Sequence, residues 1–515
     1  MRMQQAKPTN KYVKLLRTIV VSGGALLLNG MIALLLAPLI SSTVGTEAYG
    51  FVSLAKNIAQ YAVIAASALN SFAARYIVIA YHKNDLDEAN TYFSSTVFGD
   101  FLLGTGLFAI AMVFTSFMEK VLQISPAIVT DVKLLMFFVF VNFWITTVAT
   151  AFSAAGHIKN KLDTVGAFKA LAYVCEALVL IALYTLLPPR VFYVGIGLTT
   201  MSLVVAVSNG WLCKRYTPEL KVQRRYFSFQ AIKRLVVDGI WSTLNSLGDM
   251  LNQGLDLLIC NLMLTPLAMG QLALSKTFYA IFAGMFILVG QAFEPLYLKS
   301  YAKGDKETLL GDLKIAMKFS GMLSNIFFAG FVALGMAFYK LWIPNEDISL
   351  IYLLTIIGNM TTIPGGPMQP LYYIYILTLK KKLPTLITIA GGLFNVVSMY
   401  FLIRYTSLGI YAVVWTTVFV MFVINFVTNP LYMAHVLQLP WWTFYPNILR
   451  NVLSCAVLVA VFKGLSLLYT PASWPALIAS AAVLLIIGAA LHLLIVFSRR
   501  DWKQVTQLLK RRRSA

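Results

Sequence analysis

Apolar residues gather in fourteen long runs that short polar connections separate. Most of these runs reach or exceed the about 20 residues that an α-helix needs to cross a bilayer. Because lipid cannot satisfy free backbone groups, such runs indicate helices rather than open sheets. We therefore expect an all-α polytopic membrane protein. The expected spans are residues 18–40, 51–79, 92–117, 128–155, 164–187, 191–213, 236–263, 268–298, 315–341, 350–378, 383–403, 408–433, 447–469 and 475–497.

One stretch of the chain occurs twice without a shift in spacing. Residues 48–85 and 268–305 share Ala, Gly, Leu and Lys at the upstream edge and Tyr, Lys and Asp at the downstream edge. The copies begin six spans apart, so both run in the same direction through the membrane. This pattern favours two parallel six-helix lobes with a site between them. Two unrelated apolar helices, each followed by a basic loop, are the alternative.

The repeat predicts how the chain is divided. We expect an N-terminal lobe at 1–213, a basic linker at 214–235, a C-terminal lobe at 236–433, two further helices at 434–497 and a basic cytoplasmic tail at 498–515. The linker interleaves aromatic with basic residues, so we expect it to lie along the inner membrane surface.

Composition and charge agree with a membrane protein. Of 515 residues, 59% are hydrophobic and 12% charged, whereas soluble domains carry about 25% charged residues. An even number of spans places both termini on one side. If that side is cytoplasmic, thirty Lys and Arg lie inside and five outside, which predicts a multi-pass protein of the cell membrane with cytoplasmic termini. Anionic lipid headgroups then account for the net charge of +21, without nucleic acid as a partner.

Signals for enzymes and metal sites are absent from the sequence. The four cysteines form no CxxC pair, and the four histidines show no metal-ligand spacing. We find no phosphate-binding glycine loop, HExxH or nucleophile elbow. We therefore expect free thiols, no metal, no cofactor and no enzymatic activity.

Polar residues recur along the run at 236–263. These residues are Ser242, Asn245, Asp249, Asn252 and Asp256, which are 3, 4, 3 and 4 positions apart. In a continuous helix this spacing places them on one face. We interpret the face as the wall of a water-filled cavity, in which Asp249 and Asp256 bind a coupling Na⁺, a proton or a substrate group. Hydrogen bonding between helices is the alternative.

Three cations inside the runs are candidates for binding an anion. Lys56 and Lys276 occupy equivalent positions of the repeat, although their long stems also permit them to reach the interface. Arg75 is better suited to phosphate, because a guanidinium pairs with two oxygens at once. The substrate-binding candidates are Arg75, Lys56, Lys276, Asn70, Asn245 and Asn252.

Lys169 and Glu176 lie seven residues apart on one face of the run at 164–187. A structural role is one reading of this pair, and a role in transport is the other.

The run at 350–378 is expected to be broken. Residues 363–370 hold three prolines and two glycines, which a regular helix cannot accommodate. We interpret Pro364, Gly365, Gly366 and Pro367 as a hinge for alternating access or as part of the substrate wall. A kink that serves packing alone is the alternative.

The overall pattern resembles the MOP flippase superfamily, in particular its polysaccharide-transport branch of O-antigen and related glycan flippases. The turn at 45–50, the helix end at 75–81 and the repeated tyrosine at Tyr301 carry the resemblance. Lipid II flippases share the plan, but they use charged residues in the first helix, where this chain offers only Ser22, Asn29 and glycines.

The resemblance implies a flippase that moves a polyprenyl-pyrophosphate-linked oligosaccharide to the outer leaflet by alternating access. The cations would hold the pyrophosphate, the polar stripe would accommodate sugar hydroxyls, and residues 434–497 would form a groove for the lipid tail. The implied partners are the lipid-linked glycan, membrane lipids and other polysaccharide-assembly proteins. A cation-coupled drug or metabolite exporter is the first alternative. A membrane glycosyltransferase or polymerase is the second, and the short external loops speak against it.

Overall fold

The computed structural model describes residues 8–378, 380, 382–499 and 501–502, and helices are the regular secondary structure of all these parts. The predicted all-α class is therefore confirmed. Contacts divide the chain into two compact units. The first comprises Met1–Met250 and Leu257–Ala273, and the second comprises Leu251–Asp256 and Leu274–Ala515.

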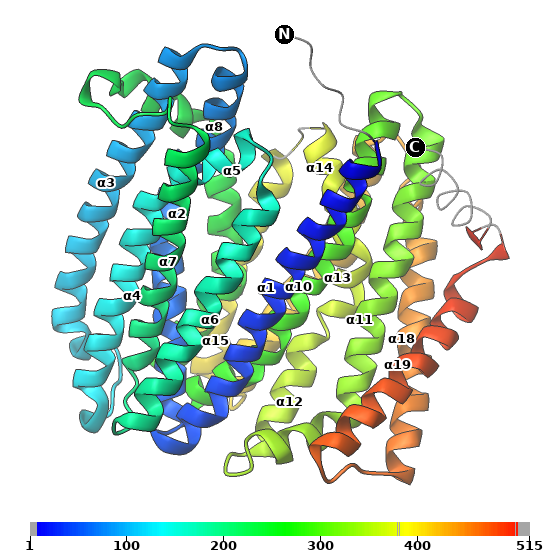
Figure 1. Ribbon diagram of the computed structural model, residues 1–515. Helices are drawn as coiled ribbons and strands as arrows, with labels where there is room; N and C mark the ends of the chain where they lie inside the picture. The colour runs from blue at the N-terminus through cyan, green and yellow to red at the C-terminus, as the bar shows by residue number, and fades with distance from the viewer. Residues whose placement is uncertain (1–7, 379, 381, 500, 503–515) are drawn as a thin grey trace. The chain divides into compact units, whose positions relative to one another are not determined.

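Long helices running side by side build the first unit (Figure 1). They are α1 Pro8–Thr43, α2 Thr46–His82, α3 Leu86–Phe117, α4 Val129–Ala149, α5 Ala154–Ile158, α6 Leu162–Leu186, α7 Tyr193–Tyr216, α8 Phe229–Asp249 and most of α9 Asp256–Met263, with the 3₁₀ turn η3 Thr150–Ser153 between α4 and α5. Helix α2 packs against α3 and α8, α7 packs against α4 and α6, and α1 packs against α6.

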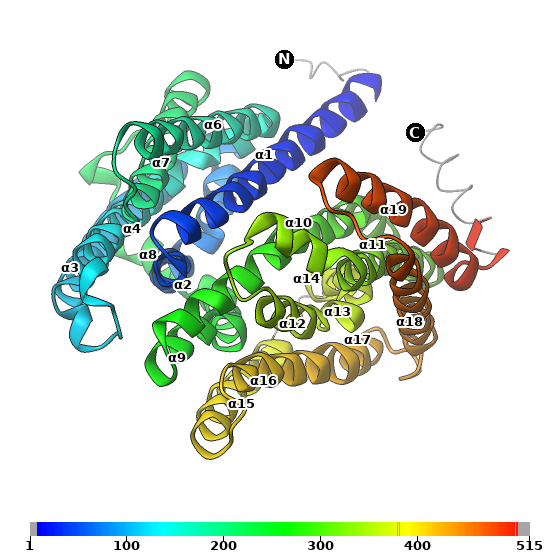
Figure 2. The same cartoon turned by 90° about the horizontal axis from the view of Figure 1, so that it is seen from below.

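Helix α11 lies at the centre of the second unit. It packs against α12, α13, α18 and α19 (Figure 2). The helices of this unit are the later part of α10 Pro266–Ala302, then α11 Lys306–Trp342, α12 Ile348–Asn359, α13 Thr362–Met368, α14 Tyr373–Thr378, α15 Lys382–Tyr405, α16 Ile410–Phe422, α17 Asn429–Val436, α18 Tyr445–Leu468 and α19 Trp474–Val496.

Twelve helical stretches among the described residues are long and apolar enough to cross a membrane. Each coincides with one of the predicted runs. The two remaining runs are 236–263, which is polar and interrupted, and 268–298, which lies in the 37-residue helix α10. The polytopic architecture is thus confirmed, and the number fourteen stays a prediction.

The run at 236–263 is not the continuous helix that its spacing predicts. Helix α8 ends at Asp249, a π-helical turn spans Met250–Gly254, and α9 begins at Asp256. Helix α8 also packs with α2 and α3 and belongs to the first unit. The boundary between the compact units therefore differs from the predicted lobe boundary at 214–235.

The predicted linker is attached to the first unit over residues 217–228. Side chains of Asn90, Ser94 and Ser95 on α3 bind its backbone. The Asn90 amide donates to the Glu219 carbonyl over 3.1 Å, and its oxygen accepts from the Lys221 N–H over 2.6 Å. Because buried backbone groups need partners, these contacts fix the segment beside α3.

The run at 350–378 is broken, as predicted, but the breaks lie on either side of the Pro-Gly cluster. Helix α12 ends at Asn359, α13 spans Thr362–Met368, and a 3₁₀ turn follows at Gln369–Tyr372. Pro364, Gly365, Gly366 and Pro367 themselves lie in the short helix α13. The hinge role stays a prediction.

Gly366 has a packing role against α11. A Cβ atom there would lie 2.0 Å from Ser324 Oγ, and the Ser320 hydroxyl donates to the Gly366 carbonyl over 2.7 Å. The close approach of α11 and α13 therefore depends on the missing side chain.

Buried polar contacts fasten the last two helices to α11. His492 on α19 contacts the Ser454 hydroxyl on α18 over 2.9 Å and the Lys318 carbonyl on α11 over 3.2 Å. The Lys318 ammonium donates to Asp501 over 2.6 Å. Burial alone would raise the pKa of Asp501, but the hydrogen bonds from Lys318 and Ser498 hold that pKa below its usual value.

Candidate functional site

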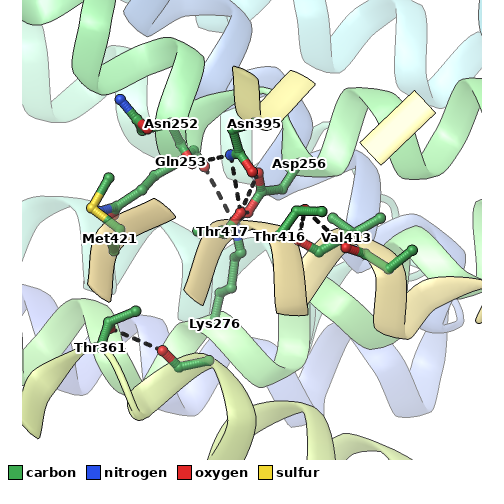
Figure 3. Close-up of polar contacts among 12 residues, drawn as sticks. Asn252, Gln253, Asp256, Lys276, Thr361, Asn395, Val413, Thr416, Thr417 and Met421 are labelled. Carbon is green, nitrogen blue, oxygen red and sulfur yellow. Dashed lines mark hydrogen bonds and ion pairs between the residues drawn. The ribbon is translucent and has the colours of Figure 1, made fainter. Parts of the chain in front are cut away.

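An ion pair between Asp256 and Lys276 lies in the second unit (Figure 3). Asp256 opens α9 directly after the π-helical turn, and Lys276 extends from α10. The Asp256 side chain is 2% exposed and the Lys276 side chain 37%. The ammonium also donates to the Gln253 carbonyl over 3.3 Å. The π-helical turn thus supplies a second oxygen for the lysine, in keeping with the frequent occurrence of such turns at functional sites.

Neutral polar groups from α15 and α16 surround this ion pair. The Thr417 hydroxyl donates to the Asp256 carboxylate over 3.4 Å. Asn395 donates to Thr417 Oγ1 over 3.2 Å and to the Asn252 carbonyl over 2.8 Å (Figure 3). We call Asn252, Asp256, Lys276, Asn395 and Thr417 the Asp256 cluster. Its carboxylate is already compensated by a cation, so the buried charge is tolerated.

The equivalent lysine of the first repeat is not paired in the same way. Lys56 on α2 is exposed and forms no ion pair or hydrogen bond with the described residues, although the charge of the buried Glu176 on α6 acts on it. The repeat thus keeps the lysine in both copies, whereas the close ion pair is formed by Lys276. Lys56, Lys276, Asp256 and Glu176 were recognisable from the sequence as charged residues inside apolar runs. Which of them lie near one another on different helices was not.

Arg75 differs from the two lysines. It is exposed on α2 and forms no ion pair or hydrogen bond with the part of the chain that the structure describes. Lys276 is thus the candidate cation that a close carboxylate neutralises, whereas the guanidinium of Arg75 has no such partner among the described residues.

Asn70 binds a carboxylate that the sequence candidates did not include. Its amide donates to Asp100 Oδ1 on α3 over 2.8 Å. Asp100 is fully buried, and its Oδ2 has no hydrogen-bond partner among the described residues. The sequence signal was available, because Asp100 is the one acidic residue of the run at 92–117. The Asn70 side chain therefore hydrogen-bonds a buried carboxylate within the first unit.

Asn245 and Asp249 are exposed on α8, and the Asn245 amide donates to Asp249 Oδ2 over 3.1 Å. Asn252 and Asp256 are buried in the second unit. The single polar face was predicted for a continuous helix, and the π-helical turn at Met250–Gly254 interrupts that helix. Since this turn accommodates more residues than an α-helical turn, the steps of 3 and 4 no longer define one face.

A family model described as polysaccharide biosynthesis protein matches residues 15–301, more than half of the chain. The chain belongs to this family. A relative is the membrane protein EpsK of Bacillus subtilis (strain 168), described as uncharacterized. It is 25% identical over 491 residues, which cover 95% of this chain and 97% of EpsK.

Two solved structures share the fold of this family member. The lipid II flippase MurJ in an inward closed conformation matches with a TM-score of 0.65 and 14% identity, over 92% of this chain and 99% of that one. An inward-facing multidrug resistance transporter of the MATE family matches with a TM-score of 0.63 and 15% identity, over 82% and 99%. The family member thus has the fold of the MOP superfamily, and the resemblance predicted from the sequence is confirmed.

Proposed function

We propose that the protein flips a polyprenyl-pyrophosphate-linked oligosaccharide from the cytoplasmic to the outer leaflet by alternating access, for the synthesis of a surface polysaccharide. Membership of the polysaccharide biosynthesis family supports a glycan substrate. The shared fold with MATE and MurJ transporters supports transport across the bilayer. The excess of basic residues in the predicted inner segments supports a cell-membrane location with both termini in the cytoplasm.

The exposed guanidinium of Arg75, which has no ion-pair partner among the described residues, is the observation that carries the proposal. A pyrophosphate keeps its negative charge, and an unpaired anion is very costly in a low-dielectric interior. The protein must therefore offer a cation that is accessible and not already neutralised. Lys276 is bound to Asp256, and the charge of Glu176 acts on Lys56, whereas Arg75 is exposed and forms no ion pair or hydrogen bond with the described residues. Its planar guanidinium can bind two phosphate oxygens together.

Replacement of Arg75 by alanine should abolish surface glycan in a complementation assay. Arg75→Lys should retain a partial signal, because it keeps the charge but loses the two-oxygen geometry. Arg75→Gln should behave like alanine. Surface glycan is measured at matched membrane levels of each variant.

The control is Lys83→Ala, which removes an exposed cation just beyond the same helix and should complement fully. Full complementation by Arg75→Ala would exclude Arg75 from the site and leave Lys56 and Lys276 as the candidate anion ligands.

Asp249 is the proposed coupling carboxylate, which binds Na⁺ or a proton. It is exposed, and its one side-chain hydrogen bond within the described part of the chain comes from the neutral Asn245. Asp256, the other candidate, already has Lys276 as its cation. A carboxylate within a membrane helix that lacks a resident cation is suited to binding one reversibly.

Asp249→Asn should remove most of the transport while leaving the amount of protein in the membrane unchanged, because asparagine has nearly the same size. Transport is measured as glycan exposure in vesicles with an imposed Na⁺ or proton gradient. Asn245→Ala, which removes only the hydrogen-bond donor, should keep its response to the gradient. If Asp249→Asn responds to both gradients as strongly as the unchanged protein, Asp249 is not the coupling group.

A further inference from the structure

A cavity with a mixed polar and apolar lining lies in the first unit, apart from the residues proposed above for transport. Its volume is about 380 Å³, and residues of α4, η3, α5, α6 and α7 line it. The polar lining includes Lys169 of α6, His157 of α5 and Asn209 of α7. The volume is near the lower end of the range for small-molecule sites, so the cavity suits one headgroup rather than an oligosaccharide.

The side chains of the cavity divide into engaged and available donors. The hydroxyls of Thr150, Ser153 and Ser202 donate to backbone carbonyls nearby in their own chain segments, over 2.8, 2.7 and 2.8 Å. Their protons are therefore not available to a ligand.

The side chains of Lys169, His157 and Asn209, in contrast, make no hydrogen bond to any described residue. An ammonium, an imidazole and a carboxamide together offer donors from three directions. The twelve lining residues include no carboxylate, so the charge of Lys169 is not balanced inside the cavity. This arrangement fits an anion with several oxygen acceptors, of which phosphate is the common biological example.

The position of the cavity indicates the source of the phosphate. Lys169 lies seven residues after the start of α6, which corresponds to about 10 Å along the helix. The same end of the first unit carries Lys159 and Lys161, and the predicted topology makes it cytoplasmic. Lys159 is held at the Tyr81 hydroxyl and Lys161 over the Tyr216 ring. The cytoplasmic leaflet is rich in anionic headgroups, and a site just below its surface is within their reach.

We propose that this cavity binds the phosphate headgroup of an anionic membrane lipid, with Lys169 as the charged ligand and His157 and Asn209 as neutral donors. The acyl chains remain in the bilayer, because the cavity has room for little more than the phosphate and glycerol. The site is independent of the proposed flippase function, since it uses neither Arg75 nor Asp249.

The test compares thermal unfolding of the full-length protein in nanodiscs of phosphatidylcholine with and without phosphatidylglycerol. A ligand that binds only the folded state raises the unfolding temperature. Phosphatidylglycerol should raise it for the unchanged protein and for Lys169→Arg, and the rise should be lost in Lys169→Gln. Native mass spectrometry should find one phosphatidylglycerol fewer on Lys169→Gln.

Lys161→Gln is the matched control, because it removes one charge at the same end of α6 but outside the cavity. It should keep the full temperature rise. An equal rise in Lys169→Gln, or an equal loss in Lys161→Gln, would overturn the proposal. Glycerol 3-phosphate is added separately to phosphatidylcholine nanodiscs. If it alone reproduced the rise, a soluble phosphate rather than a lipid would be the ligand.

Discussion

Replacing Lys276 by methionine is expected to lower the free energy of unfolding by up to about 3 kcal/mol, the lower end of the cost of breaking a buried ion pair, because the Lys276 side chain is 37% exposed. Methionine fills similar space but leaves the Asp256 carboxylate without its cation. That carboxylate is 2% exposed, and only the Thr417 hydroxyl and other neutral groups of the Asp256 cluster remain near it. Breaking a buried ion pair from one side is costly because the remaining charge stays desolvated. Thermal unfolding in detergent, followed by the amount of monodisperse protein, measures the loss.

A second substitution should restore most of this stability. Asp256→Asn in the Lys276→Met background removes the uncompensated charge and keeps nearly the same shape, and replacing both partners of a buried pair is often neutral. The double variant should therefore be more stable than Lys276→Met alone, with a large coupling energy between the sites. Lys340→Met is the control, because Lys340 is exposed at the end of α11, and it should change stability by less than about 0.5 kcal/mol. An unfolding temperature of Lys276→Met equal to that of the unchanged protein would contradict the ion pair.

The helices were predictable from the sequence because the membrane makes run length decisive. A run such as 51–79 had to be helical to cross lipid, and the structure extends it to α2 Thr46–His82. The helix is longer than the apolar run because polar residues at both ends, such as Glu47 and His82, also adopt the helical conformation. Helix α8 similarly begins at Phe229 rather than at 236, because the Ser228 side chain accepts from the Ala231 N–H and caps it.

The candidate residues were predictable as a set, but their partners were not. A charge inside an apolar run is visible in the sequence, and Lys276 and Asp256 were found in this way. Their pairing depends on the π-helical turn at Met250–Gly254, which changes the helical register and has no signature in the period of apolar residues. The contact between Asn70 and Asp100 likewise joins two helices whose relative rotation is a matter of tertiary packing.

The repeat also leads to a contact that its sequence match did not reveal. Gly50 and Gly270 hold equivalent positions in the two copies, and both lie in the first unit. A Cβ atom on Gly50 would lie 2.8 Å from Gly270 Cα, and one on Gly270 would lie 2.2 Å from the Thr46 carbonyl oxygen. The matched glycines therefore permit two backbones to touch, which explains why a side chain is absent at both positions.

Gly270→Ala is expected to destabilise the protein by about 3 kcal/mol, the upper end of the usual cost of overpacking. The atom that the new methyl group meets belongs to the main chain of Thr46, so no rotamer change can relieve the contact and the two helices must separate. Gly50→Ala should also destabilise, since it meets the backbone of Gly270. Thermal unfolding is compared with that of Gly106→Ala on α3, where a Cβ atom meets nothing within 4 Å. That control should be neutral or gain up to about 1 kcal/mol, because alanine favours the helix over glycine. If Gly270→Ala matched Gly106→Ala in stability, the close backbone approach would not exist in the folded protein.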